Sequence, residues 1–185
     1  VEVMGHKVGW LTLSAGLASG ADVILLPEIP YDLDKVCEAI KKRHSRGKKF
    51  TILAVAEGAI SKEMAELKKK DRKKAMEKML EKYPSVSYKL AADITERTGS
   101  EVRVTVPGHV QRGGSPDPFD RVLTTKLGAY AAKLIVDDEY GYMVATVNNQ
   151  IVKVPLEASA GQLKSVDPHD QTVELAKYIG ISFGD

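Results

Sequence analysis

The stretch ADVILLPE, residues 21–28, contains four consecutive apolar residues followed by a proline and a glutamate. An unbroken apolar run of this length is typical of a strand covered on both faces, as in a parallel sheet. FTILAVAEG (50–58) is a second run of this kind, and VEVMG (1–5) and VRVTVPG (102–108) are shorter candidates. The sequence therefore predicts several buried parallel strands.

Helix-like segments separate these strand candidates. GWLTLSAGLASG, residues 9–20, predicts a helix of small residues that ends at a glycine. DLDKVCEAIKKRHSRG, residues 32–47, has apolar residues at helical spacing, with acids early and bases late, as the helix dipole favours. This alternation predicts an α/β fold, a Rossmann-like parallel sheet flanked by helices.

The later part of the chain continues with helices and one hairpin. Residues 61–99 predict a solvent-facing helix and, after Pro84, a better-packed one. Residues 120–136 predict another helix, and residues 141–155 predict a hairpin whose turn is the pair of asparagines at 148 and 149. Residues 171–180 predict a short final helix.

Composition limits the classes of protein that fit. The chain has 185 residues, 43% of them apolar and 28% charged, with a net charge of +2. These values describe a soluble globular chain, and no apolar stretch approaches the ~20 residues that span a bilayer. The single cysteine, Cys37, excludes an internal disulfide and a cysteine-rich zinc site, and we interpret it as a core residue. We expect a cytoplasmic protein with no membrane partner and no resident metal.

The lysine-rich run KKKDRKK, residues 68–74, raises the alternative of nucleic-acid binding. Acidic residues flank the run, and no aromatic side chains interleave with its lysines for base stacking. We therefore interpret it as the solvated face of a helix and expect no nucleic-acid partner.

Polar residues follow three of the strand candidates. Met4, Gly5 and His6 follow the first, Glu57 follows the run at 50–58, and VPGHVQRGG ends the run at 102–108 with a histidine and an arginine. Ligands of parallel α/β sheets bind at the carboxyl ends of the strands. Each residue has a plainer alternative: Glu57 as a helix cap or surface acid, the histidine as a structural hydrogen-bonding group, and the glycines as a turn.

The set taken together indicates a phosphorylated sugar. An ionised carboxylate accepts hydrogen bonds from sugar hydroxyls, and a guanidinium gives a phosphate two charge-assisted bonds at once. Three neighbouring strand ends would bring Glu57, His109 and Arg112 to one crevice.

Three stretches resemble landmarks of the 6-phosphofructokinase family: residues 1–28, ILAVAEGA (52–59) and RVTVPGHVQRGGSPDPFDRVL (103–123). The resemblance runs from residue 1 to about 154 and implies the fold of that family. It implies that Met4 and Gly5 contact fructose 6-phosphate, that Glu57 binds its hydroxyls, and that His109 and Arg112 hold its 6-phosphate.

The resemblance also implies contributions between subunits. Arg103 corresponds to an arginine that reaches a neighbouring subunit's site, which requires a homo-oligomer, a dimer or a tetramer. Asp22, Arg46 and Lys48 match an effector site of regulated members, although RGKK also serves simply as a cationic helix end. His6 departs from the family, which usually has arginine there to stabilise the transferring phosphoryl group. Lys7 is placed to compensate in part.

Two family motifs are absent from this sequence, a GGDGS-type loop for the phosphate donor and a TIDND-type motif that holds the catalytic aspartate. The resemblance places both before Val1, so we expect the carboxy-terminal half of the enzyme, inactive alone. Mg²⁺ with ATP or pyrophosphate would then bind outside this chain, and no catalytic residue is expected within it.

We expect three parts: a sugar-phosphate domain (1–114), a helix and hairpin that pack on a nucleotide domain (115–154), and a tail returning to the sugar domain (155–185). The implied activity is glycolytic conversion of fructose 6-phosphate to fructose 1,6-bisphosphate. A non-catalytic regulatory module that binds a sugar phosphate is the alternative, and His6 favours it.

Overall fold

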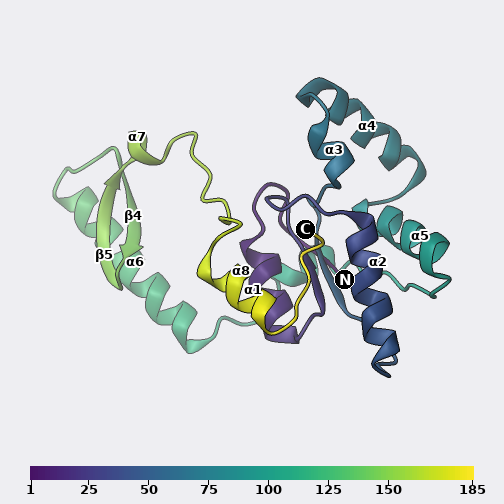
Figure 1. The fold of residues 1–185 in the computed structure, drawn as a ribbon. Coiled ribbons are helices and arrows are strands. Elements are labelled where there is room, and N and C mark those ends of the chain that lie inside the picture. The colour runs from purple at the N-terminus through teal and green to yellow at the C-terminus, as the bar shows by residue number, and fades with distance from the viewer. The chain divides into compact units, whose positions relative to one another are not determined.

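Three parallel strands form the sheet that the apolar runs predict. In the computed structural model, which describes residues 1–185, β1 (Glu2–Val3), β2 (Val23–Leu25) and β3 (Leu53–Ala56) lie in the order β1-β3-β2 (Figure 1). The central strand β3 pairs in parallel with both neighbours. The predicted α/β fold, a parallel sheet flanked by helices, is confirmed.

One face of the sheet is covered by α2 (Leu33–Ser45) and α5 (Val86–Thr98). Val23, Leu25 and Val55 pack there against the apolar sides of both helices. Successive strand residues point to opposite faces, so every second residue of the run at 21–28 is used on this side. Helix α2 begins where the sequence predicts, because the Asp32 side chain accepts a hydrogen bond from the Asp34 N–H at 2.8 Å.

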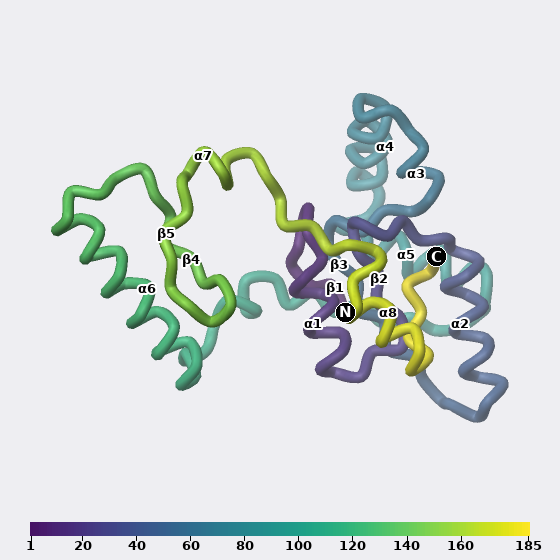
Figure 2. Tube along the Cα trace, turned by 60° about the vertical axis from the view of Figure 1, so that its left-hand side comes forward, coloured from purple at the N-terminus to yellow at the C-terminus, as the bar shows by residue number.

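The other face is covered by α1 (Trp10–Ser19) and α8 (Gln171–Tyr178), giving three layers (Figure 2). Ile24 and Ala54 point to this side and pack with Leu13 of α1. Residues near the end of the chain complete the layer. The N–H of Ile24 donates to the Ser182 carbonyl at 2.9 Å, and Phe183 is fully buried.

The predicted strand at residues 102–108 is wrong in part. No strand is formed between Glu101 and Pro107. The segment still runs beside β1, since the Glu2 N–H donates to the Thr105 carbonyl at 2.9 Å. Thr105 and Val106 are exposed and Pro107 has no N–H to donate. The alternating apolar pattern is therefore not accompanied by the repeated backbone hydrogen bonds of a strand.

The lysine-rich segment forms two helices, α3 (Lys62–Glu66) and α4 (Lys69–Lys82), where the sequence predicts one. The backbone becomes extended at Leu67, and the Arg72 guanidinium donates to the carbonyls of Ala65 and Leu67 across the break. No residue of α4 is buried, which confirms its solvent-facing character.

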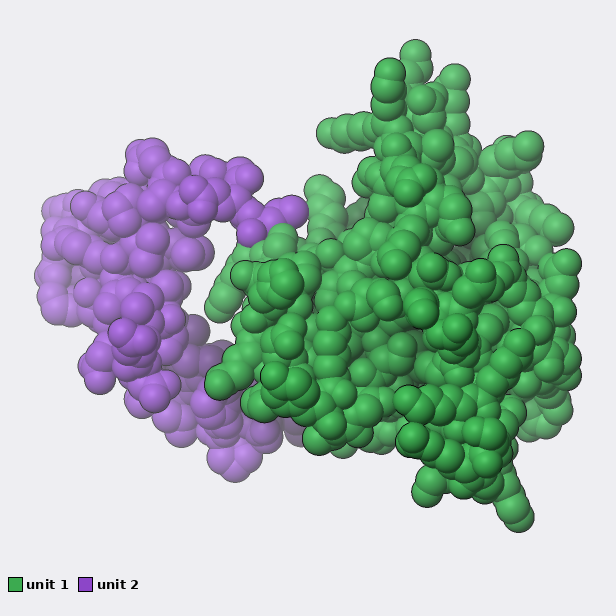
Figure 3. Space-filling view, viewed as in Figure 1, with its two compact units in different colours: residues 1–111, 164–185 green, residues 112–163 purple.

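Residues 112–163 form a second compact unit, distinct from the unit of residues 1–111 and 164–185 (Figure 3). It contains α6 (Pro118–Val136), the antiparallel strands β4 (Tyr142–Val147) and β5 (Gln150–Pro155), and α7 (Leu156–Ser159). The asparagines at 148 and 149 have positive φ, as the predicted turn requires. This unit runs to Leu163, and within it the Leu156 N–H donates to the Gly141 carbonyl at 3.0 Å.

The second unit has almost no core. Leu134 is its only buried apolar residue, whereas Phe119, Val122, Ile135 and Val136 of α6 are between 54% and 82% exposed. Packing of residues 115–154 on a further domain stays a prediction. No helix of the chain is both long enough and apolar enough to cross a membrane.

Phe183→Ala tests whether the last residues complete the core. The side chain is 0% exposed, so we expect the variant to lose about 3–5 kcal/mol of unfolding free energy. Phe50→Ala is the control, because Phe50 is 66% exposed and its loss should cost within about 0.5 kcal/mol. Chemical denaturation of both variants measures the difference, and equal stabilities would contradict the assignment.

Tyr31 makes the stability of the unit of residues 1–111 and 164–185 depend on pH in the alkaline range. Burial, and then the charges of Asp93 and Glu63, raise the pKa of Tyr31 to about 12. Below pH ~10 this tyrosine is neutral in both folded and unfolded chains and contributes no pH dependence. From there upward only the unfolded chain ionises, so stability falls by about 2 kcal/mol towards pH ~12. Tyr31→Phe should remove that part of the slope in alkaline denaturation, and an unchanged slope would refute it.

Candidate functional site

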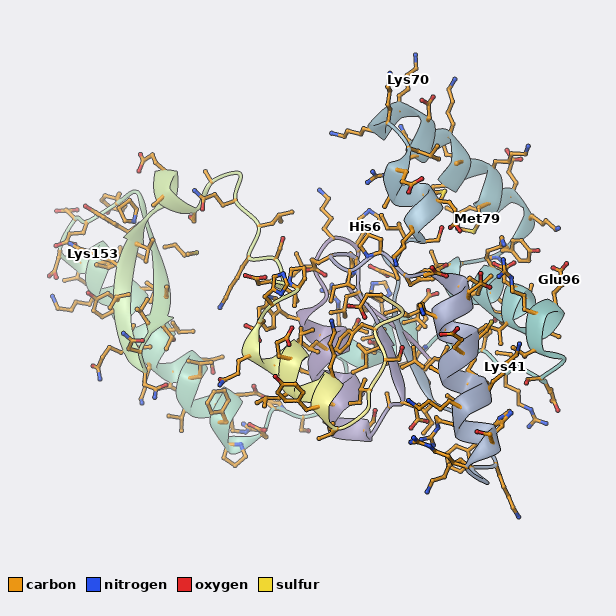
Figure 4. The ribbon with its side chains drawn as sticks, viewed as in Figure 1. His6, Lys41, Lys70, Met79, Glu96 and Lys153 are labelled. Carbon is orange, nitrogen blue, oxygen red and sulfur yellow. The ribbon has the colours of Figure 1, made fainter.

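The loops that follow β1 and β3 touch each other. The Glu57 N–H donates to the Val3 carbonyl at 3.0 Å, continuing the strand pairing up to the first site residue. A Cβ at Gly58 would lie 1.9 Å from the His6 carbonyl oxygen and 3.1 Å from that of Gly5. Only glycine fits there, so the two loops are in direct backbone contact. Figure 4 labels His6 in the loop that follows β1.

The turn that carries the histidine joins the same place. Residues Gly108–Arg112 form a 3₁₀ turn, η1. The Gln111 side chain accepts a hydrogen bond from the Met4 N–H at 3.1 Å and donates one to the Gly108 carbonyl at 3.2 Å. The structure therefore brings together the backbone segments of Met4, Gly5, His6, Glu57 and His109.

Three side chains at this junction have no polar partner within the chain. His6 and His109 are exposed and Glu57 is half-buried, and none of the three makes a hydrogen bond or ion pair. Carboxylate and imidazole groups left free in this way are available to a ligand with hydroxyl and anionic groups. Arg112, the last residue of η1 and the first of the second unit, is also exposed and unpaired.

Arg103 is not brought to these loops. Its Nε pairs with Glu101 Oε1 at 2.9 Å, and it lines a cavity of about 610 Å³ together with Val1 and Leu53, at the amino ends of β1 and β3. A second cavity, of about 520 Å³, lies between α5, α3 and α4. Neither cavity is lined by Met4, Glu57 or His109.

Asp22 of the expected effector set is already engaged within the chain. Its carboxylate pairs with Arg43 at 2.8 Å and accepts the Ile52 N–H at 2.8 Å. Arg46 and Lys48 are exposed. Sequence reasoning missed Arg43, a half-buried residue near the end of α2.

Gln111 and Glu28 are two further residues whose roles sequence reasoning missed. Glu28 Oε1 accepts hydrogen bonds from the N–H groups of Gly9 and Val166, which fixes the start of α1 to the returning chain.

Burial raises the pKa of the Cys37 thiol, in keeping with an unreactive core residue. No group of three or more His, Cys, Asp or Glu side chains is arranged to hold a metal ion.

Comparison with known proteins identifies the family to which the chain belongs. A family model described as Phosphofructokinase matches residues 1–135. The chain belongs to the phosphofructokinase family. ATP-dependent 6-phosphofructokinase of Spirochaeta thermophila is 47% identical over 185 residues, and ATP-dependent 6-phosphofructokinase 2 of Clostridium perfringens is 44% identical over 192. Each match covers 100% of this chain and 50% of the relative, so the chain spans about half the length of these relatives.

Solved phosphofructokinases share the fold. The match with the T-state phosphofructokinase of Pichia pastoris covers 96% of this chain and 17% of the Pichia chain, with a TM-score of 0.64 and 35% identity. A pyrophosphate-dependent phosphofructokinase of Nitrosospira multiformis matches 100% of this chain and 48% of its own, with a TM-score of 0.73. At 19% identity the second likeness concerns the fold alone.

Gly58→Ala tests the contact between the two loops. The added methyl group would meet the His6 carbonyl, a backbone atom that cannot move without displacing the Met4–His6 loop. We expect a loss of about 2 kcal/mol or more in unfolding free energy. Gly128→Ala in α6 is the matched control, because nothing lies within 4 Å of its new methyl group and alanine favours a helix. Equal melting temperatures for the two variants would disprove the contact.

Proposed function

We propose that this chain binds fructose 6-phosphate and forms the sugar-phosphate side of a 6-phosphofructokinase active site. The observation that carries the proposal is the junction of the Met4–His6 loop, Glu57–Gly58 and η1, held by the Gln111 hydrogen bonds and by the backbone contact at Gly58. The side chains there are free and match a sugar phosphate in chemistry. The family and the names of the relatives support the same substrate.

Each residue has a distinct part in this proposal. Glu57 accepts hydrogen bonds from the sugar hydroxyls, since an ionised carboxylate only accepts. His109 and Arg112 bind the 6-phosphate, Arg112 through two parallel charge-assisted bonds. Met4 and Gly5 line the sugar, and Gly5 leaves room in this loop, since a Cβ there would lie 2.8 Å from the Val8 carbonyl oxygen.

The whole reaction would transfer a phosphoryl group from ATP or pyrophosphate, with Mg²⁺, to the sugar 1-hydroxyl in glycolysis. Catalysis of this kind depends on positioning and charge neutralisation. The residues of this chain would supply substrate orientation and neutralisation of the 6-phosphate. We assign donor binding and proton removal to the other half of the relatives' length, and we expect no turnover by these residues alone. The reducing cytoplasm suits the single buried thiol.

Arg103 supports a homo-oligomer. It is exposed, and it lies at the amino ends of the strands rather than beside Glu57. We propose that it serves the site of a neighbouring copy. Binding of an effector at Arg46 and Lys48 is also a proposal, and in it Asp22 acts through its pairing with Arg43.

A second candidate function is a sugar-phosphate-binding module without catalysis. His6 favours it, because an imidazole is shorter than the arginine usual in the family and only partly charged near neutral pH. The two functions share the binding step and differ in turnover. A kinase assay of the protein with its donor-binding half separates them, since only the enzyme forms fructose 1,6-bisphosphate.

Arg112→Ala tests the proposed site by calorimetric titration of the 185-residue chain with fructose 6-phosphate. Loss of a charge-assisted contact worth about 1.5–3 kcal/mol should weaken binding by about tenfold or more. Lys126→Ala removes an exposed, unpaired cation of α6 and serves as the control for net charge. Absence of binding by the unmodified chain, or equal weakening in both variants, would refute the proposal.

A further inference from the structure

The amide of Gln111 connects two segments that each carry part of the candidate site. Its Oε1 accepts the Met4 N–H at 3.1 Å, and its Nε2 donates to the Gly108 carbonyl at 3.2 Å. The first bond spans most of the length of residues 1–111, while the second lies within the η1 turn. One side chain therefore fixes the turn internally and attaches it to the loop after β1.

The local structure requires such a partner. β1 ends at Val3, and the Met4 N–H has no other acceptor. A half-buried N–H without an acceptor is costly, so Gln111 satisfies a group that the sheet leaves free. Gln111 is itself half-buried, whereas its neighbours Val110 and Arg112 are exposed. Its side chain points into the junction, away from solvent.

We propose that Gln111 is a positioning residue that holds the phosphate-binding turn at a fixed distance from the sugar-binding loop. The inference rests on the proposed function. Fructose 6-phosphate must contact both segments at once, so its affinity depends on their spacing. Inorganic phosphate contacts only the turn. The primary amide is suited to this task because it supplies a donor and an acceptor together, on a side chain long enough to reach both segments.

Gln111→Met tests this role, since methionine has a similar length and no hydrogen-bonding amide. We expect fructose 6-phosphate to bind about tenfold more weakly, while the affinity for inorganic phosphate is unchanged. Gln162→Met is the matched control, an exposed glutamine of the second unit that bonds only through its backbone N–H. Equal weakening of both ligands would mean that Gln111 only builds the turn, and unchanged sugar-phosphate affinity would mean that it positions nothing.

Amide exchange separates this inference from the proposed function. In the ligand-free chain, Gln111→Met should accelerate exchange of the Met4 N–H, with no change at the Glu57 N–H, which is bonded to Val3. If the unmodified chain binds no fructose 6-phosphate, the proposed function fails, and faster exchange at Met4 still supports the connection between the segments. Unchanged exchange at Met4 overturns the connection itself.

Discussion

The candidate site depends on the close approach of the chain after β1 to the chain after β3. β3 pairs with a strand on each side, and its pairing with β1 continues through the bond from Glu57 to Val3. The two strands therefore leave the sheet together, and their loops meet where Gly58 lies against the His6 carbonyl. A side chain at residue 58 would separate the loops and move Glu57 away from Met4 and Gly5. The geometry of this junction therefore depends on the missing side chain at Gly58.

Most of the fold could be predicted from the sequence because its signals are local. The runs at 21–28 and 50–58 become strands covered on both faces, and the helices at 9–20 and 32–47 end near their glycines. The run at 102–108 has the same alternating composition but lies at the edge of the sheet. It makes one backbone hydrogen bond to β1, too few for a strand. Composition does not report the number of such bonds, so it could not separate this segment from the true strands.

Less of the candidate site could be predicted, because hydrogen bonds between distant residues leave no pattern in the sequence. The position of Glu57 at a strand exit was predictable from the parallel sheet, whereas His109 lies in the η1 turn after a segment that forms no strand. The bond from Met4 to Gln111, the pairing of Asp22 with Arg43, and the contacts of Glu28 with Gly9 and Val166 were not predictable. Each joins segments far apart in the chain. The roles of Arg112 and Arg103 toward a substrate or a neighbouring copy remain proposals.

The burial of Phe183 and the bond from Ile24 to Ser182 have a consequence for how the chain acquires its structure. The face of the sheet that carries α2 and α5 can assemble from contacts within the first hundred or so residues. The opposite face cannot close until most of the chain has been synthesised, and contacts of such long range slow folding. During that interval Ile24, Leu26 and Ala54 are covered on this side by α1 alone, so part of an apolar face stays open to association with other chains.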